Sequence, residues 1–245
     1  MHWRTLGSVA LSAALLLLNM MPMARTAPPA DEARAKEELR EVLRATPEGR
    51  HGAQLYAICA ECHGRHGEGN ANGWPPQIAG QHRRVIAKEL VDYRTGVRWY
   101  DPMQREAGRH VLGSTQDVAD VAAFVAAMPP SPDTTPGPRR RVGKGAELYV
   151  LRCQWCHGVR GEGSDERLVP RVAGQQYEYL LRQLQDTRER RRPNMRAQHL
   201  RLIESFSSED LMGISDYMSR LDRPGASSTP VIQRGPPAAV VLGDH

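Results

Sequence analysis

Apolar residues recur at helical spacing in both halves of the chain. A stripe with the spacing i, i+3, i+4, i+7 predicts an amphipathic helix. The residues are Tyr177, Leu180, Leu181 and Leu184 in the second half and, more weakly, Ile86, Leu90 and Tyr93 in the first. No alternation of apolar and polar residues, the pattern typical of strands, competes with these stripes. We therefore expect an all-α protein.

Each half also ends in a helix whose start is marked in the sequence. Ser114-x-x-Asp117 and Ser207-x-x-Asp210 have the form of capping boxes, in which a serine and an acidic residue satisfy the free N–H groups of a first turn. Apolar stripes follow both boxes. Shorter helices are expected earlier in each half, from Gly52 and from Gly145, and each leads into a cysteine motif.

The two halves are copies of one unit. Cys59-Ala-Glu-Cys62-His63-Gly64 returns as Cys153-Gln-Trp-Cys156-His157-Gly158. The Gly-Glu-Gly that follows is repeated as well, and so is a Pro-x-x-Ala-Gly-Gln loop that starts at Pro76 and again at Pro170. A period this long indicates duplicated domains rather than a solenoid.

The repeat sets the expected organisation of the chain. Residues 48–130 and 143–222 are the two domains, and a linker rich in Pro and Arg at 131–142 joins them. A charged helix within residues 28–47 lies outside the repeat and is interpreted as a solvated spacer. We expect a disordered tail at 223–245.

The N-terminus resembles a secretory signal. Arg4 precedes an apolar stretch at 9–18, and small residues follow near position 27, so residues 1–27 are interpreted as a signal peptide. An uncleaved anchor is the alternative. Both interpretations place the rest of the chain outside the cytoplasm, and we expect the periplasm. No uncharged apolar run long enough for a membrane helix follows.

Charge and composition narrow the function classes. The formal net charge of the chain is +5, but residues 31–138 are net negative and residues 139–222 net positive. This division excludes the uniform basic surface of a nucleic-acid-binding protein. Aromatic residues are only 5% of the chain, which is little for two self-sufficient small cores. We therefore expect something other than side chains to fill part of each core.

Cys-x-x-Cys-His is the attachment signature of c-type haem. One helical turn presents two thiols to the two vinyl groups of the haem, and the next residue, His, reaches the iron from the same side. The motif occurs twice, so we expect two covalently bound haem c groups, with Cys59, Cys62 and His63 at the first and Cys153, Cys156 and His157 at the second. A thioredoxin-like pair needs a βαβ context that is missing here. A zinc site and structural disulfides remain alternatives.

The sixth iron ligand separates a carrier from a catalyst. Ligation by His and Met favours electron transfer. Met103 and Met195 follow the two motifs at a similar distance, each shortly after a Pro, in what is expected to be the loop before the last helix. Both are predicted ligands. The competing candidates are His82 and His110 in the first copy and His199 in the second.

These motifs, the paired Pro-x-x-Ala-Gly-Gln loops, the single Met before each last helix and the exported start resemble dihaem class I cytochromes c of the cytochrome c-four type. The resemblance covers roughly residues 48–222. It implies two all-helical cytochrome c domains with haems in close contact. It also implies that the carbonyls of Pro76 and Pro170 accept from the ligating histidines, and that Gly52 and Gly145 let the first helix cross the last near Phe124 and Tyr217.

The resemblance further implies a periplasmic electron carrier and not an enzyme. The expected donor is a cytochrome bc complex or a dehydrogenase, and the expected acceptor is a terminal oxidase. Peripheral association with a membrane remains open. The alternatives are a cytochrome subunit of a dehydrogenase complex and a small dihaem redox enzyme, either a peroxidase or a thiosulfate-oxidising cytochrome. The arginine-rich run at 188–192 is either a solvated helix end or a landing patch for an acidic partner.

Overall fold

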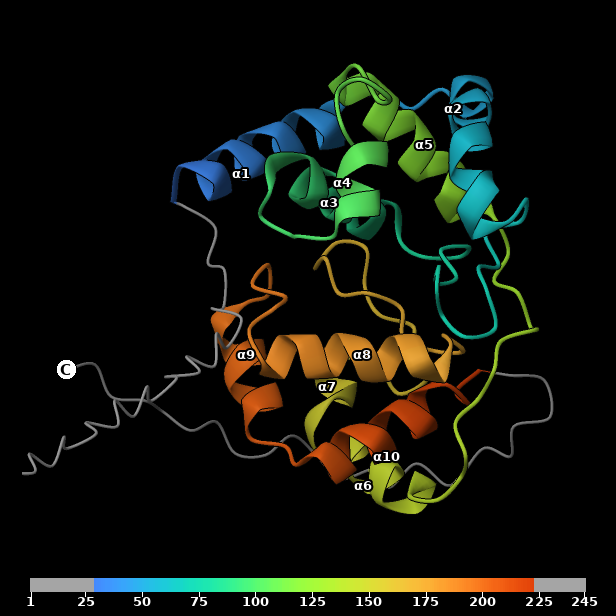
Figure 1. Cartoon of the computed structure of the whole chain (residues 1–245), viewed down its shortest axis with the longest axis vertical. Coiled ribbons are helices and arrows are strands. Elements are labelled where there is room, and N and C mark those ends of the chain that lie inside the picture. The colour runs from blue at the N-terminus through green and yellow to red at the C-terminus, as the bar shows by residue number, and fades with distance from the viewer. Residues whose placement is uncertain (1–28, 223–245) are drawn as a thin grey trace, which may run out of the picture.

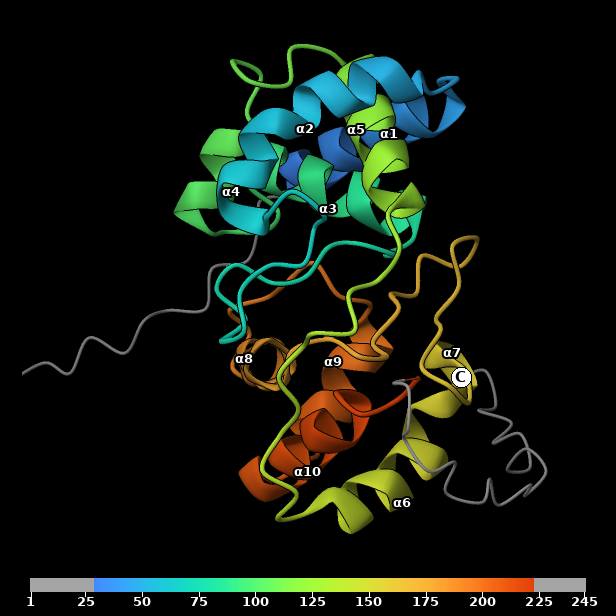
Figure 2. The same ribbon diagram turned by 90° about the vertical axis from the view of Figure 1, so that its right-hand side faces the viewer.

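The computed structural model describes residues 29–222, and this part of the chain folds into two stacked groups of helices (Figures 1 and 2). The predicted signal peptide and C-terminal tail lie outside the described residues. The helices are α1 (Pro29–Arg44), α2 (Gly49–His63), α3 (Arg83–Thr95), α4 (Asp101–Glu106), α5 (Thr115–Ala127), α6 (Val142–Arg152), α7 (Gln154–His157), α8 (Tyr177–Arg188), α9 (Ala197–Glu204) and α10 (Ser208–Met218). Between residues 29 and 222 there is no strand, only one isolated bridge between Ser164 and Val169. The all-α expectation is confirmed.

The last helix of each domain is the centre of its core. In the first domain α5 packs against α2 and α3, and Val118 and Ala122 are fully buried. In the second domain α10 packs against α6 and α8, with Leu211 fully buried. Both predicted capping boxes form at the starts of these helices. The boxes therefore fix where each central helix begins.

The N-terminal helix α1 is part of the first domain, so its interpretation as a solvated spacer is wrong. It packs on α3 and α5, and Val42 is fully buried. The carboxylate of Glu38 is also buried, where Arg94 donates to it at 2.7 Å and Arg109 lies 3.1 Å away. The many charges of α1 suggested an exposed helix, but its face toward α3 and α5 is apolar apart from one paired carboxylate.

The crossings of the first and last helices depend on glycine. A Cβ atom on Gly52 would lie 2.3 Å from the backbone oxygen of Asp120, and one on Gly145 would lie 1.8 Å from that of Gly213. Beside these crossings Tyr56 packs against Phe124 and Tyr149 against Tyr217 as tilted ring pairs, each at 5.4 Å between ring centroids. The close approach implied by the resemblance is confirmed in both domains.

The linker is fixed to the surface of the second domain. The backbone carbonyl of Thr135 accepts from the N–H of Tyr177 at 3.1 Å, and the N–H of Gly137 donates to the Ser219 hydroxyl at 3.2 Å. At its start, the N–H of Ser131 donates to the side chain of Gln77 at 2.8 Å. These bonds limit the freedom of the two domains to reorient.

Glutamines join the two Pro-x-x-Ala-Gly-Gln loops across the domain interface. The Gln81 side chain donates to the carbonyl of Arg171 at 3.0 Å and accepts from its N–H at 2.9 Å. In the matching bond, the Gln175 side chain donates to the carbonyl of Gln77 at 2.8 Å. The interface is therefore approximately two-fold symmetric, and each loop is held by the glutamine of the other.

A charged network beside these loops departs from that symmetry. Glu89 on α3 pairs with Arg98 of its own domain and with Arg192 of the second domain, the latter at 2.9 Å. Asn194 donates to Asp92 at 2.7 Å and to Glu89 at 3.2 Å. Burial alone would raise the pKa of Glu89, but Arg98, Arg192 and Lys88 outweigh it and hold the pKa well below its ordinary value. The carboxylate is thus charged where the domains meet.

Gly145→Ala is expected to lower the free energy of unfolding by at least about 2 kcal/mol, because the added methyl group meets a backbone oxygen that cannot move without separating the helices. Urea denaturation of the holoprotein measures the change. Gly143→Ala is the matched control in the same helix, because a Cβ at Gly143 meets nothing within 4 Å. It should be neutral or gain about 0.5 kcal/mol. Equal effects of the two substitutions would contradict the close-approach argument.

Glu89→Gln is expected to cost about 3 kcal/mol of stability at neutral pH, because two covered arginines lose their common partner. The folded-state pKa of Glu89 is depressed, so its contribution is complete above the unfolded carboxyl pKa of about 4.3 and is lost as the pH falls. The difference in free energy of unfolding between wild type and variant should therefore become smaller below about pH 4. Glu147→Gln, which removes an exposed pair with Lys144, is the control and should cost at most about 1 kcal/mol. A stability difference that does not change with pH would contradict the role given to the charged Glu89 carboxylate.

Candidate haem sites

The first Cys-x-x-Cys-His motif lies in the last turn of α2. Cys59 is half-buried, Cys62 is exposed, and His63, the last residue of the helix, is buried. One helical turn thus presents two sulfur atoms and one imidazole at the end of a helix. The Gly64 that follows has a φ of +80°, which turns the chain sharply away from the motif.

The second motif has the same order but a different helix. Here α6 ends at Arg152, and Cys156 and His157 lie on the separate short helix α7. Cys153 stands between the two helices and is half-buried, whereas Cys156 is exposed. Gly158 repeats the turn with a φ of +82°. The short helix expected to lead from Gly145 into the motif is present as α6, and the motif itself lies on a separate turn of helix.

The four cysteines of the chain are free thiols. The alternative of structural disulfides is therefore wrong in this structure. Residues 29–222 contain no group of three or more His, Cys, Asp or Glu side chains arranged to hold a metal ion, so the motifs do not converge on a zinc site either. Burial raises the pKa of Cys59 to about 11 and that of Cys153 to about 12. Both half-buried sulfurs are thus kept neutral in an apolar setting that suits a thioether.

Each motif histidine is oriented by a proline carbonyl. The Nδ1 atom of His63 lies 2.8 Å from the oxygen of Pro76, and that of His157 lies 3.0 Å from the oxygen of Pro170. These bonds confirm the contact implied by the resemblance. With Nδ1 engaged, Nε2 is left as the metal-binding atom, an arrangement common among metal-ligating histidines. Burial lowers the pKa of both imidazoles, which keeps them neutral and able to bind iron.

Two tyrosines, which sequence reasoning missed, hold the turn that follows each motif. The hydroxyl of Tyr56 donates to the carbonyl of Gly64 at 2.6 Å, and that of Tyr149 donates to Gly158 at 2.7 Å. Burial raises the pKa of Tyr56 to about 12 and that of Tyr149 further, so both remain protonated donors. The signal was present in the sequence, because each tyrosine stands four residues after the repeated glycine of its copy, Gly52 or Gly145.

The two candidate methionines are half-buried but differ in local structure. Met103 lies within helix α4, which corrects the expectation of a loop. Met195 lies in an irregular stretch before α9, and α9 itself separates it from the last helix α10. The second domain therefore has one more regular helix on this side than was expected.

The competing histidines are placed very differently. His82 lies 2.8 Å, Nε2 to oxygen, from the carbonyl of Glu162 in the other domain, and His110 is exposed. His199 is close to a motif, with its ring centroid 6.3 Å from that of His157. Burial, His157 and Arg192 lower the pKa of His199 to about 4, which keeps it neutral. Only the second domain thus brings a candidate histidine near the motif.

Large apolar side chains stand exposed at and near both motifs. Of these, Ile58, Leu151, Trp155 and Val159 flank or interrupt the cysteines, and Trp74, Trp99 and Tyr100 lie on the loops that follow the first motif. Exposed apolar side chains beside the cysteines indicate a surface that another apolar body covers, whereas Trp74 already contacts Tyr100 and Arg182. Two free thiols, an oriented imidazole and uncovered apolar side chains fit a haem in each domain.

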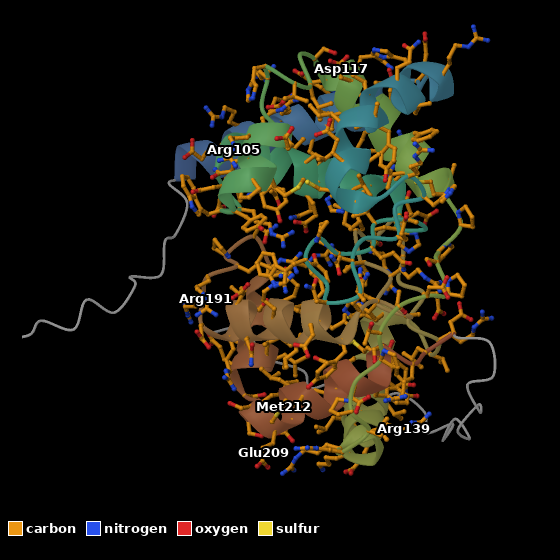
Figure 3. All side chains as sticks on the ribbon, turned by 45° about the vertical axis from the view of Figure 1, so that its right-hand side comes forward. Arg105, Asp117, Arg139, Arg191, Glu209 and Met212 are labelled. Atoms are coloured by element: carbon orange, nitrogen blue, oxygen red, sulfur yellow. The ribbon has the colours of Figure 1, made fainter. Side chains whose placement is uncertain are left out.

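The arginine-rich run at 188–192 is largely engaged within the protein. Arg190 pairs with Glu204, Arg191 with Asp186 and Arg192 with Glu89. Figure 3 shows Arg191 at the edge of the molecule, close to α8. Three of the four arginines thus have acidic partners within the protein, so the run is a helix end engaged in ion pairs rather than a patch of unpaired charges.

Comparison with known proteins agrees with this geometry. The family model described as cytochrome c matches residues 50–129 and 142–221. Cytochrome c4 of Azotobacter vinelandii is 31% identical over 187 residues, which span 67% of this chain and 85% of the relative. The thiosulfate dehydrogenase electron acceptor of Stutzerimonas stutzeri (strain A1501) is 30% identical over 176 residues, 66% of this chain and 78% of the relative.

A solved structure is similar over both domains. The crystal structure of reduced recombinant cytochrome c4 from Pseudomonas stutzeri aligns with a TM-score of 0.65 and 27% identity, covering 72% of this chain and 100% of that one. The duplicated fold, the paired motifs and these similarities agree. The chain belongs to the cytochrome c family, as a dihaem member of the cytochrome c4 type with two covalently bound haem c groups.

Proposed function

We propose that the haem of the first domain is held by Cys59, Cys62, His63 and Met103, and that of the second by the matching set. That set is Cys153, Cys156, His157 and Met195. The observation that carries the proposal is the pair of histidine–proline hydrogen bonds, which leave one ring nitrogen of each motif histidine free beside two free thiols. The methionines are assigned by their matching place after each motif and by their half-buried position.

The protein carries electrons between other proteins. Haem supplies reversible one-electron oxidation and reduction of its iron. The chain itself attaches and orients the group, and His/Met ligation raises the reduction potential. It also links the two sites, because the loops that carry Pro76 and Pro170 are joined across the interface by Gln81 and Gln175. A fixed interface supports electron exchange between the domains.

The expected place of this carrier is the periplasm, after export directed by residues 1–27. No helix among residues 29–222 is long and apolar enough to cross a membrane. A cytochrome bc complex or a dehydrogenase is the proposed donor, and a terminal oxidase the proposed acceptor. Cytochrome c4 relatives support the role of a carrier.

A dehydrogenase-linked role is the second candidate. It rests on the relative named as the electron acceptor of a thiosulfate dehydrogenase. The cofactor chemistry would be unchanged, and only the donor would differ. Stable copurification with a dehydrogenase subunit would select this candidate. A dihaem enzyme requires an iron with an open or exchangeable site, which the following experiment also reveals.

A redox titration of the purified holoprotein, followed in the visible spectrum, tests the assignment. Two reversible steps are expected, each with loss of the weak far-red band of Met-ligated ferric haem on reduction. Met103→Leu should remove only the contribution of the first haem, because leucine keeps the volume but has no sulfur. Met128→Leu, at the end of α5, is the control and should leave the band unchanged. A band that survives Met103→Leu at full intensity would rule out this ligand.

A further inference from the structure

The strongest feature that the proposed function leaves unused is His199 on α9. Its ring lies 6.3 Å from the ring of His157, centroid to centroid, with 57° between the ring planes. Its Nδ1 atom is covered and has no hydrogen-bond partner within residues 29–222. Buried nitrogens without partners are rare and costly in folded proteins, so each one requires an explanation. An ordered water or a group bound outside the polypeptide would supply the missing partner.

The separation of the two rings matches a pair of imidazoles on opposite sides of one iron. Because imidazole nitrogens bind metal ions at about 2 Å, and each nitrogen lies about 1 Å from its ring centre, two such rings have centres about 6 Å apart. The angle between the planes does not restrict the pairing, since each ring is free to rotate about the axis through the metal. Histidine binds metals through either ring nitrogen.

The first domain has no counterpart. The residue that stands four positions after Met103, as His199 stands after Met195, is Ala107, which is fully buried. The nearest histidine along the chain, His110, is exposed. His82 is engaged with the backbone of the other domain. A second histidine near the motif is therefore a property of the second site alone.

The residue before Met195 is hydrogen-bonded to the first domain. Asn194, the residue before Met195, donates to Asp92, and its carbonyl accepts from Lys88 at 3.2 Å. His199 depends on no such contact, because it lies on α9, which packs against α8 of its own domain. The two candidate ligands of the second iron are thus positioned by different parts of the molecule.

We propose that His199 is a second distal ligand of the haem in the second domain, and that it coordinates the iron opposite His157 whenever the Met195 thioether is not bound. The inference rests on the proposed function, in so far as it needs a haem on Cys153 and Cys156. It predicts that the two sites respond differently to loss of their methionine. The first iron would be left with an open position, and the second would remain six-coordinate.

The test compares Met103→Leu, Met195→Leu and Met195→Leu/His199→Ala as ferric holoproteins, by electron paramagnetic resonance and visible spectroscopy. Met103→Leu is expected to give a high-spin signal from one haem of the two. Met195→Leu is expected to give none, and instead a new low-spin signal from a bis-imidazole haem. The double variant should then become high-spin, and added imidazole should return it to low spin.

Two results would overturn the proposal that His199 binds the second iron. A high-spin second haem in Met195→Leu, equal to that of the first haem in Met103→Leu, would overturn the proposal. So would a low-spin second haem that persists in the double variant. Haem content, measured as pyridine haemochrome per chain, separates these results from failure of the proposed function, which would appear as fewer than two haems in the wild type. His199→Ala alone is expected to keep two low-spin haems, and a high-spin second haem there would overturn the assignment of Met195 instead.

Discussion

The hydrogen bond between a motif histidine and a proline carbonyl connects three levels of this structure. On one side it orients the imidazole at the end of a helix. On the other it fixes the loop that begins at the proline, and Gln77, the next residue after Pro76, is bonded to the second domain through Gln175 and Gln176. Orientation of the ligand, conformation of the loop and attachment of the domains are therefore parts of one arrangement.

Much of this arrangement was predictable from the sequence, because it depends on local patterns that occur twice. The cysteine motifs and the capping boxes at Ser114 and Ser207 have a fixed local chemistry, whereas the glycine crossings were implied by the resemblance to cytochromes c. Repetition made each of them more specific. The cofactor followed from the cysteine motifs, and the all-α fold from the apolar stripes at helical spacing.

What was not predictable depends on contacts between segments far apart in the chain. The charges of α1 suggested exposure, because nothing in the sequence shows that Arg94 and Arg109 reach Glu38. The run at 188–192 suggested a basic patch for the same reason, since its partners lie on α3, α8 and α9. The proximity of His199 to His157 likewise required the packing of α9 to be known. Composition and spacing carry no information on such pairings.

The docking of α1 has a consequence for the order in which the first domain forms. This helix precedes the rest of the domain in the chain, yet its buried face rests on α3 and α5, which come later. A polypeptide that emerges from its N-terminus therefore cannot close this face until residue 127 has followed. Contacts between distant segments raise the contact order of a domain, which slows its folding. The first part of the domain to appear thus waits for the last, and until α5 has emerged the cysteines at 59 and 62 lie in a domain that is still open.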